Sequence, residues 1–174
     1  MVIRPETAND YGAIRDLLVK AFANHPYSHQ TEHLIVEALR SAGALTAALV
    51  AERHGTVAGH IAFSPANINS CDWNLFALGP IAVLPEFQRQ GIGRKLIEEG
   101  LKLLCGQGAH GCVLVGDPAF YTRFGFQHNP MLTLKGVPPE VLMSMTMVEP
   151  CPRGEISLHP AALSMNSPKR LAAA

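Results

Sequence analysis

A buried strand that runs through a glycine loop into a helix is the feature that most constrains this fold. An apolar run over residues 73–84 ends at Pro85, and a helical hydrophobic period covers residues 91–105. Gly91 and Gly93 lie at the junction. Glycines at such a turn let backbone N–H groups approach a ligand, because no Cβ is in the way. The helix start adds unpaired N–H groups and the positive end of the dipole, so the segment predicts an anion site, most naturally for phosphate.

The charges on this helix support the same interpretation. Acidic side chains favour the first turn of a helix and basic ones disfavour it, because of the helix dipole. Here Arg94 and Lys95 lie in the first turn, whereas Glu98 and Glu99 follow one turn later. A bound polyanion would offset the two misplaced cations. The alternative is that each cation pairs with the glutamate four residues ahead of it.

Two familiar phosphate-binding loops do not fit this segment. A P-loop requires Gly-Lys followed by Ser or Thr, a combination that the sequence lacks. A dinucleotide-binding loop requires a third glycine three residues after Gly93, where Leu96 stands. These two classes of phosphate loop are therefore excluded, and the case for an anion site rests on the strand-to-helix context of the glycines.

The remaining hydrophobic pattern predicts an α/β fold. Residues 57–68 and 73–84 read as antiparallel neighbours. The helix over 91–105 joins the second of them to a buried strand over 112–115, so those two strands should be parallel. No assignment follows for residues 136–154, which are rich in Pro, Gly and Met. The other expected elements are helices over 11–22 and 30–40, strands over 2–4, 45–51 and 155–159, a short helix over 118–124, and a strand that opens at Phe126.

Length and composition limit the functional classes. With 174 residues, we expect a single domain over 1–164, followed by a disordered tail over 165–174. Fourteen basic residues balance fourteen acidic ones, which excludes a strongly basic nucleic-acid-binding chain and a polybasic membrane anchor. No signal peptide and no apolar run of about 20 residues occurs, so we expect a cytoplasmic protein with reduced cysteines.

Two motifs identify the family that this sequence resembles. Residues 88–93, Gln-Arg-Gln-Gly-Ile-Gly, match the GNAT superfamily loop, which reads Gln or Arg, two residues, Gly, one residue, Gly or Ala. Residues 116–126 end in the family's frequent Tyr-x-x-x-Gly-Phe, and residues 81–87 resemble its central strand and exit. Within the superfamily, the sequence is most similar to bacterial YhbS-type acetyltransferases. The resemblance covers residues 2–130 and implies a mixed, splayed central β-sheet flanked by helices.

The resemblance also implies acetyl-CoA as cosubstrate, with no metal. Its pantetheine arm would lie where the central strand and the next parallel strand separate, bonded to the backbone of Ile81 and Val83. The glycine loop would hold the pyrophosphate, mainly through N–H groups. A bulge would occur at Gly79-Pro80, since Pro lacks a ladder donor. The residues implied to bind acetyl-CoA are Ile81, Ala82, Val83, Gln88, Arg89, Gln90, Gly91, Ile92, Gly93 and Arg94.

The implied reaction is N-acetyl transfer to a primary amine by direct attack, through a tetrahedral intermediate. Tyr121 is the candidate for the general acid that protonates the leaving thiolate, and the N–H of Ile81 is the candidate oxyanion donor. The alternative for Tyr121 is a core residue whose hydroxyl bonds the backbone. The acceptor, a small-molecule or peptide amine, has no sequence signal, and whether the protein forms a homodimer stays open.

The sequence departs here from a pattern common in the family, in which the central strand carries a glutamate. Residues 74–84 contain no carboxylate, so the general base must be sought elsewhere. Glu32 is the first candidate, and Asp72, His33 and His60 follow. Attack by an amine that is already neutral, or through a water relay, also stays open.

Three histidines have a spacing that metal ligands on a helix can show. His25, His29 and His33 are spaced by four residues. Pro26 interrupts any helix across them, so we expect no metal site.

Two other functions stay open. The missing strand carboxylate fits a non-catalytic acyl-CoA-binding or sensing domain, which would bind acetyl-CoA without turnover. A glycine loop alone also fits a nucleotide-binding adaptor, in which CoA would fail to compete with ATP. The N-acetyltransferase is the main hypothesis.

Overall fold

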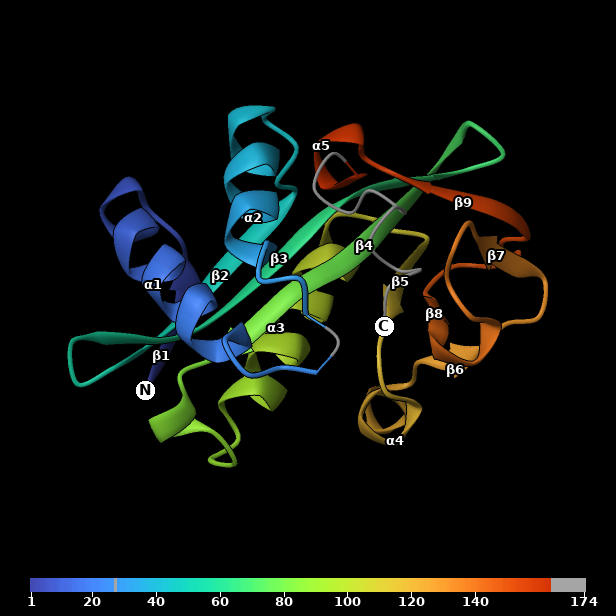
Figure 1. The fold of residues 1–174 in the computed structure, drawn as a ribbon. Coiled ribbons are helices and arrows are strands. Elements are labelled where there is room, and N and C mark those ends of the chain that lie inside the picture. The colour runs from blue at the N-terminus through green and yellow to red at the C-terminus, as the bar shows by residue number, and fades with distance from the viewer. Residues whose placement is uncertain (27, 164–174) are drawn as a thin grey trace.

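The architecture is a mixed β-sheet with α1 and α2 on one face and α3 on the other (Figure 1). The computed structural model describes residues 1–26 and 28–163. Within them the strand order is β1-β2-β3-β4-β5-β8-β6, and β9 pairs with β3 and β7. The helices are α1 Tyr11–Phe22, α2 Glu32–Ser41, α3 Ile92–Gly106, α4 Pro118–Tyr121 and α5 Pro160–Leu163. The strands are β1 Val2–Pro5, β2 Ala47–Arg53, β3 Thr56–Ile68, β4 Cys71–Val83, β5 Gly111–Val115, β6 Gln127–His128, β7 Leu132–Leu134, β8 Leu142–Thr146 and β9 Gly154–Leu158.

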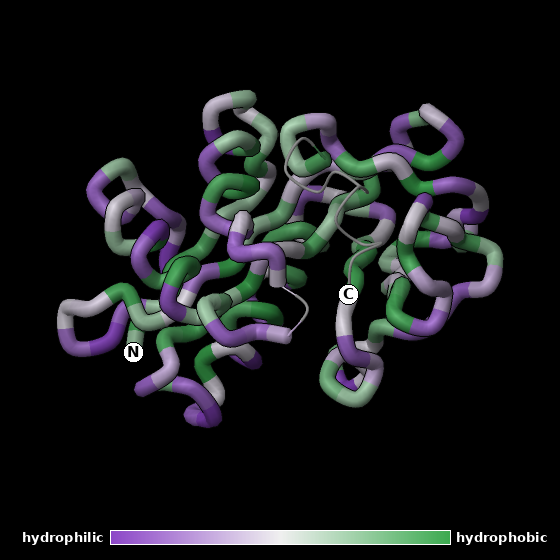
Figure 2. Tube along the Cα trace, viewed as in Figure 1, coloured by the Kyte–Doolittle hydropathy of each residue, from purple (hydrophilic) through white to green (hydrophobic). Residues whose placement is uncertain are grey.

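Alternation along the strands divides the core between the two faces of the sheet. Leu49 and Ala51 of β2 pack in the cluster under α3, whereas Val50 between them packs in the cluster under α1 and α2. Gly59 of β3 lets α3 approach closely, since a Cβ there would lie 2.9 Å from the Ile92 side chain. Hydrophobic residues accordingly follow the central strands, and hydrophilic ones gather at the hairpin turns (Figure 2).

β4 is the strand that positions the candidate site. Its first half pairs in parallel with β5 as far as Ala77 and Val113, and beyond that point the two strands separate. β4 stays paired with β3 as far as Val83. The register with β3 shifts at Gly79-Pro80, where β4 carries one residue more than its partner. The parallel pair, the splayed sheet and the bulge that the sequence predicts are therefore confirmed.

The predicted elements begin and end within two residues of their expected bounds, and the short helix expected over 118–124 is α4 followed by a 3-10 turn, Thr122–Phe124. The helix expected over 30–40 begins at Glu32, and the strand expected over 45–51 begins at Ala47. The unassigned residues 136–154 contain β8, which pairs antiparallel with β5 and extends the sheet. The tail expected over 165–174 lies outside the described residues. No helix in the described part of the chain is long and apolar enough to cross a membrane.

Candidate active site

The open edge of β4 presents two backbone N–H groups. Leu84 donates its N–H to the carbonyl of Ala58 on β3, 2.9 Å away. Since N–H groups alternate sides along a strand, those of Ile81 and Val83 point away from β3, toward the side from which β5 has separated. The backbone groups of Ala82 face β3 instead, and its side chain is buried under α1 and α2. Ile81 and Val83 can therefore bond a ligand laid along this edge.

The loop after β4 gathers consecutive backbone donors at the start of α3. Gly91 ends the loop with a left-handed φ of +81°, which suits glycine. Among the described residues, the N–H groups of residues 89–94 have no acceptor, and the first bond of α3 runs from Lys95 N–H to the Gly91 carbonyl at 3.1 Å. A Cβ on Gly91 would meet no atom within 4 Å, so space lies open beside these donors. The side chain of Ile92 is buried, so only its backbone can face a ligand. The donors and the dipole together are suited to bind an anion.

Side-chain hydrogen bonds hold this loop in its conformation. Gln88 donates from Nε2 to the Val83 carbonyl at 3.1 Å, and Gln90 donates to a loop carbonyl at 3.1 Å. Arg53, at the end of β2, donates to the Gln90 side-chain oxygen. Its guanidinium also lies 5.7 Å from the centre of the Phe87 ring. Sequence reasoning missed Arg53, because it lies far from the loop along the chain and belongs to no motif.

The charges at the helix start do not by themselves require an anion. Arg94 donates from Nε to Oε1 of Glu98 at 2.7 Å, and this hydrogen bond raises the pKa of the guanidinium. Lys95 has no ion pair with any described residue. The alternative pairing therefore holds for Arg94 and not for Lys95. Because the Arg94 side chain is 70% exposed, its pair contributes little stability. The prediction of an anion site therefore depends on the backbone donors.

Tyr121 lies at the end of α4, a short helix fixed by its cap. Asp117 accepts the Ala119 N–H at 2.9 Å through its side chain. The Tyr121 ring contacts Phe126 edge to face and packs on the same core cluster as Ile81. Burial raises the pKa of Tyr121 to about 12. The phenol is therefore protonated at neutral pH, and its hydroxyl makes no hydrogen bond with the described residues.

Glu32 is the first residue of α2, which lies against β4. Ser28 donates its hydroxyl to Oε1 of Glu32 at 2.6 Å. The second oxygen, Oε2, is buried and has no partner among the described residues. A buried carboxylate oxygen without a donor is costly, so this atom is suited to accept a proton or a hydrogen bond from a ligand.

His60, another candidate base, bonds Glu6 through Nε2, and its Nδ1 is buried without a partner among the described residues. It is fully buried, with Nε2 3.0 Å from Oε2 of Glu6, and Arg40 donates to the same carboxylate at 2.8 Å. Burial would raise the pKa of Glu6, but the hydrogen bonds from His60 and Arg40 outweigh it and lower that pKa. The network ties β3 to α2, which is a structural role.

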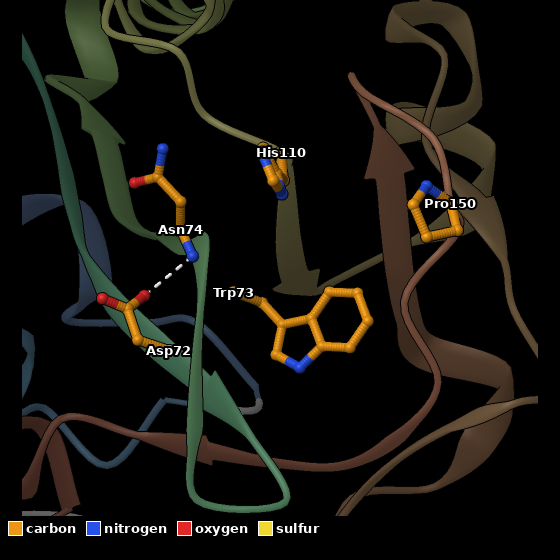
Figure 3. A pocket seen from close by; sticks show the side chains of 5 residues that line it. All are labelled: Asp72, Trp73, Asn74, His110 and Pro150. Atoms are coloured by element: carbon orange, nitrogen blue, oxygen red, sulfur yellow. Dashed lines mark hydrogen bonds between the residues drawn. The ribbon is translucent and has the colours of Figure 1, made fainter.

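Asp72 lies too far from the splay to serve as the base. It lines a surface pocket of about 300 Å³ with Trp73, Asn74, His110 and Pro150 (Figure 3). Ile81 stands nine positions further along β4, which corresponds to roughly 30 Å at ~3.3 Å per residue. The pocket is therefore separate from the predicted site, and Asp72 is excluded as the general base. Nowhere in the described ranges do three His, Cys, Asp or Glu side chains gather closely enough to hold a metal ion.

Comparison with known proteins identifies the family. Residues 45–128 match the sequence profile described as the acetyltransferase (GNAT) domain. The chain is 38% identical to the uncharacterized N-acetyltransferase YhbS of Escherichia coli K12 over 128 residues, 73% of this chain and 74% of that protein. The chain belongs to the GNAT family of N-acetyltransferases. The conserved architecture extends past the matched residues, because two solved GNAT structures align over almost the whole chain.

Those two structures were solved with the cofactor. A GNAT acetyltransferase from Brucella melitensis, in complex with acetyl-CoA, is 44% identical, with a TM-score of 0.83 over 92% of this chain and 96% of that one. YhbS from Escherichia coli, in complex with CoA, is 30% identical, with a TM-score of 0.84 over 92% of this chain and 90% of that one. This GNAT enzyme therefore shares its fold with proteins that bind the predicted cosubstrate.

Proposed function

We propose that this GNAT enzyme binds acetyl-CoA with the pantetheine arm along the open edge of β4 and the pyrophosphate at the start of α3. The observation that carries the proposal is the set of unpaired N–H groups over residues 89–94, beside the open space at Gly91. Ile81 and Val83 supply further donors on the same side of β4. The relatives solved with acetyl-CoA and CoA support the same ligand.

Acetyl transfer then proceeds by direct attack of a primary amine on the thioester carbonyl. The N–H of Ile81 stabilises the oxyanion of the tetrahedral intermediate, because it points toward the open edge. As the intermediate collapses, the carbon–sulfur bond breaks and Tyr121 donates its proton to the thiolate. The raised pKa of Tyr121 keeps that proton available at neutral pH.

Glu32 is the proposed acceptor of the proton that the amine must lose. Its Oε2 is buried and has no partner among the described residues, and an ammonium group would supply the missing donor. An alkylammonium has a pKa near ~10.4, so the neutral nucleophile is scarce at pH 7 without a base. Glu32→Gln should lower kcat at neutral pH. The loss of kcat should become smaller as the pH approaches the pKa of the free amine. Glu140→Gln, an exposed glutamate outside the site, is the matched control.

The remaining properties follow the sequence expectations. We propose a single acyltransferase domain over residues 1–164 that acts in the cytoplasm on a small-molecule or peptide amine. A homodimer stays a prediction.

The test is acetyl transfer by the purified chain to a panel of amino acids, polyamines and peptides, with free CoA followed by a thiol reagent and products by mass spectrometry. At least one amine should be acetylated. Tyr121→Phe should lower kcat by ~10²–10⁴-fold, with the KM for acetyl-CoA little changed. Binding of acetyl-CoA without turnover of any amine would support the non-catalytic acyl-CoA-binding domain instead.

A further inference from the structure

We propose that Gly116 is a positioning residue for Tyr121, because its missing side chain sets where the phenol lies. This inference rests on the proposed role of Tyr121 as general acid. It predicts that a single methyl group at position 116 lowers kcat without touching any ligand-binding group.

Gly116 lies directly under the Tyr121 ring. A Cβ on Gly116 would stand 2.4 Å from Cε2 of that ring and 2.9 Å from Cδ2. Ordinary contact for a Cβ begins at 3.4 Å, so the ring would have to move by about 1 Å. Cε2 is bonded to the carbon that carries the hydroxyl, so the push falls on the reactive end of the side chain. A displacement of ~1 Å can cost ~10²-fold in rate.

The groups around the Tyr121 ring restrict how it can move to avoid an added methyl group. The backbone N–H of Tyr121 donates to the Asp117 carbonyl at 3.1 Å, so the α4 backbone is held. Phe120 and Phe126 meet the ring edge to face, with centroids 4.9 and 6.0 Å away. Phe126 is fully buried and cannot retreat. The added methyl would therefore tilt the phenol out of its place.

The backbone at Gly116 itself does not require glycine. It has no left-handed φ, unlike Gly125 a few residues later. Its N–H donates to the Val141 carbonyl at 2.9 Å, a bond that alanine would keep. The effect of Gly116→Ala should therefore come from the contact with Tyr121 and not from backbone strain.

A double-mutant cycle on kcat tests this inference. Gly116→Ala should lower kcat by roughly 10–100-fold, with the KM for acetyl-CoA within about 2-fold of the wild type. In the Tyr121→Phe background the same substitution should cost less than about 2-fold, because no hydroxyl remains to misplace. Gly12→Ala in α1, where a Cβ meets nothing within 4 Å, is the control and should leave kcat unchanged. Unchanged kcat in Gly116→Ala, or equal losses in both backgrounds, would overturn the inference.

A stability cycle separates this inference from the proposed function. Gly116→Ala should lower the melting temperature by roughly 2–10 °C, and Tyr121→Ala should remove that loss by removing the ring. If Tyr121→Phe alone keeps wild-type kcat, the general-acid proposal has failed, and with it the catalytic effect of Gly116. If instead Gly116→Ala destabilises equally with and without the Tyr121 ring, the positioning itself is wrong.

Discussion

Gly91→Val is the sharpest perturbation of the anion site. The glycine holds a φ of +81°, and a left-handed conformation costs ~1–2 kcal/mol for a residue with a Cβ. A Cβ there meets no protein atom, so the folded chain has room for the side chain. At ~2–4 °C per kcal/mol for a chain of this size, the apo melting temperature should fall by about 2–8 °C.

The loss of ligand affinity should be far larger than this loss of stability. The valine would occupy the space beside the free N–H groups of residues 89–94. Hydrogen bonds to a charged group are worth ~1.5–3 kcal/mol each, so losing two weakens binding by ~10²–10⁴-fold. Calorimetric titration with CoA measures this directly.

Gly43→Val is the matched control for this experiment. Gly43 follows α2, has a φ of +64°, and likewise has no atom within 4 Å of a built Cβ. It should show the same loss of melting temperature with unchanged affinity for CoA. A folded Gly91→Val protein that binds CoA within about 3-fold of the wild type would refute the assignment of the loop.

Three other outcomes follow from individual contacts. Arg53→Ala removes the hydrogen bond to the Gln90 side chain, so the KM for acetyl-CoA should rise by ~2–5-fold with kcat unchanged. An unchanged KM in steady-state kinetics would show that this contact does not contribute to cosubstrate binding. The pKa of Tyr121, raised to about 12, favours the neutral phenol, so kcat should not fall through its ionisation below pH ~11; a limb near pH 10 that vanishes in Tyr121→Phe would contradict this. Asp10 is buried and bonded to Arg4 at 2.7 Å, which holds its pKa well below the usual value. Its carboxylate therefore stabilises the fold above pH ~4 and loses that effect as the pH falls, so Asp10→Asn should cost ~2–3 kcal/mol in urea unfolding at pH 7 and progressively less in acid.

Hydrophobic runs and helical periodicity predicted the elements whose structure is determined by neighbouring residues along the chain. The long apolar runs of β3 and β4 and the period of α3 specify their own structure, and the crossover helix then requires β4 and β5 to be parallel. β8 escaped prediction because it is five residues long among turn-forming residues, and its partner β5 lies about thirty residues away along the chain. Its pairing is a tertiary event that periodicity does not encode.

The same division holds for the candidate site. The glycine loop was predictable, because its donors come from one continuous segment. The exclusion of Asp72, the bonds from His60 and Arg40 to Glu6 and the contact of Arg53 with Gln90 depend on segments that only the folded chain brings together. The contact between Gly116 and Tyr121 was likewise hidden, although both residues stand in one motif, since the sequence does not give the direction of the ring.

The central claim is that CoA binds along the open edge of β4 and at the start of α3. Amide chemical shifts in a ¹H–¹⁵N NMR titration with CoA test it most directly. The largest changes should fall on the N–H groups of Ile81, Val83 and residues 89–94, with Trp73 and His110 unaffected. Changes at Trp73 and His110, with none in the loop, would place the ligand in the pocket at the other end of β4 and contradict the account.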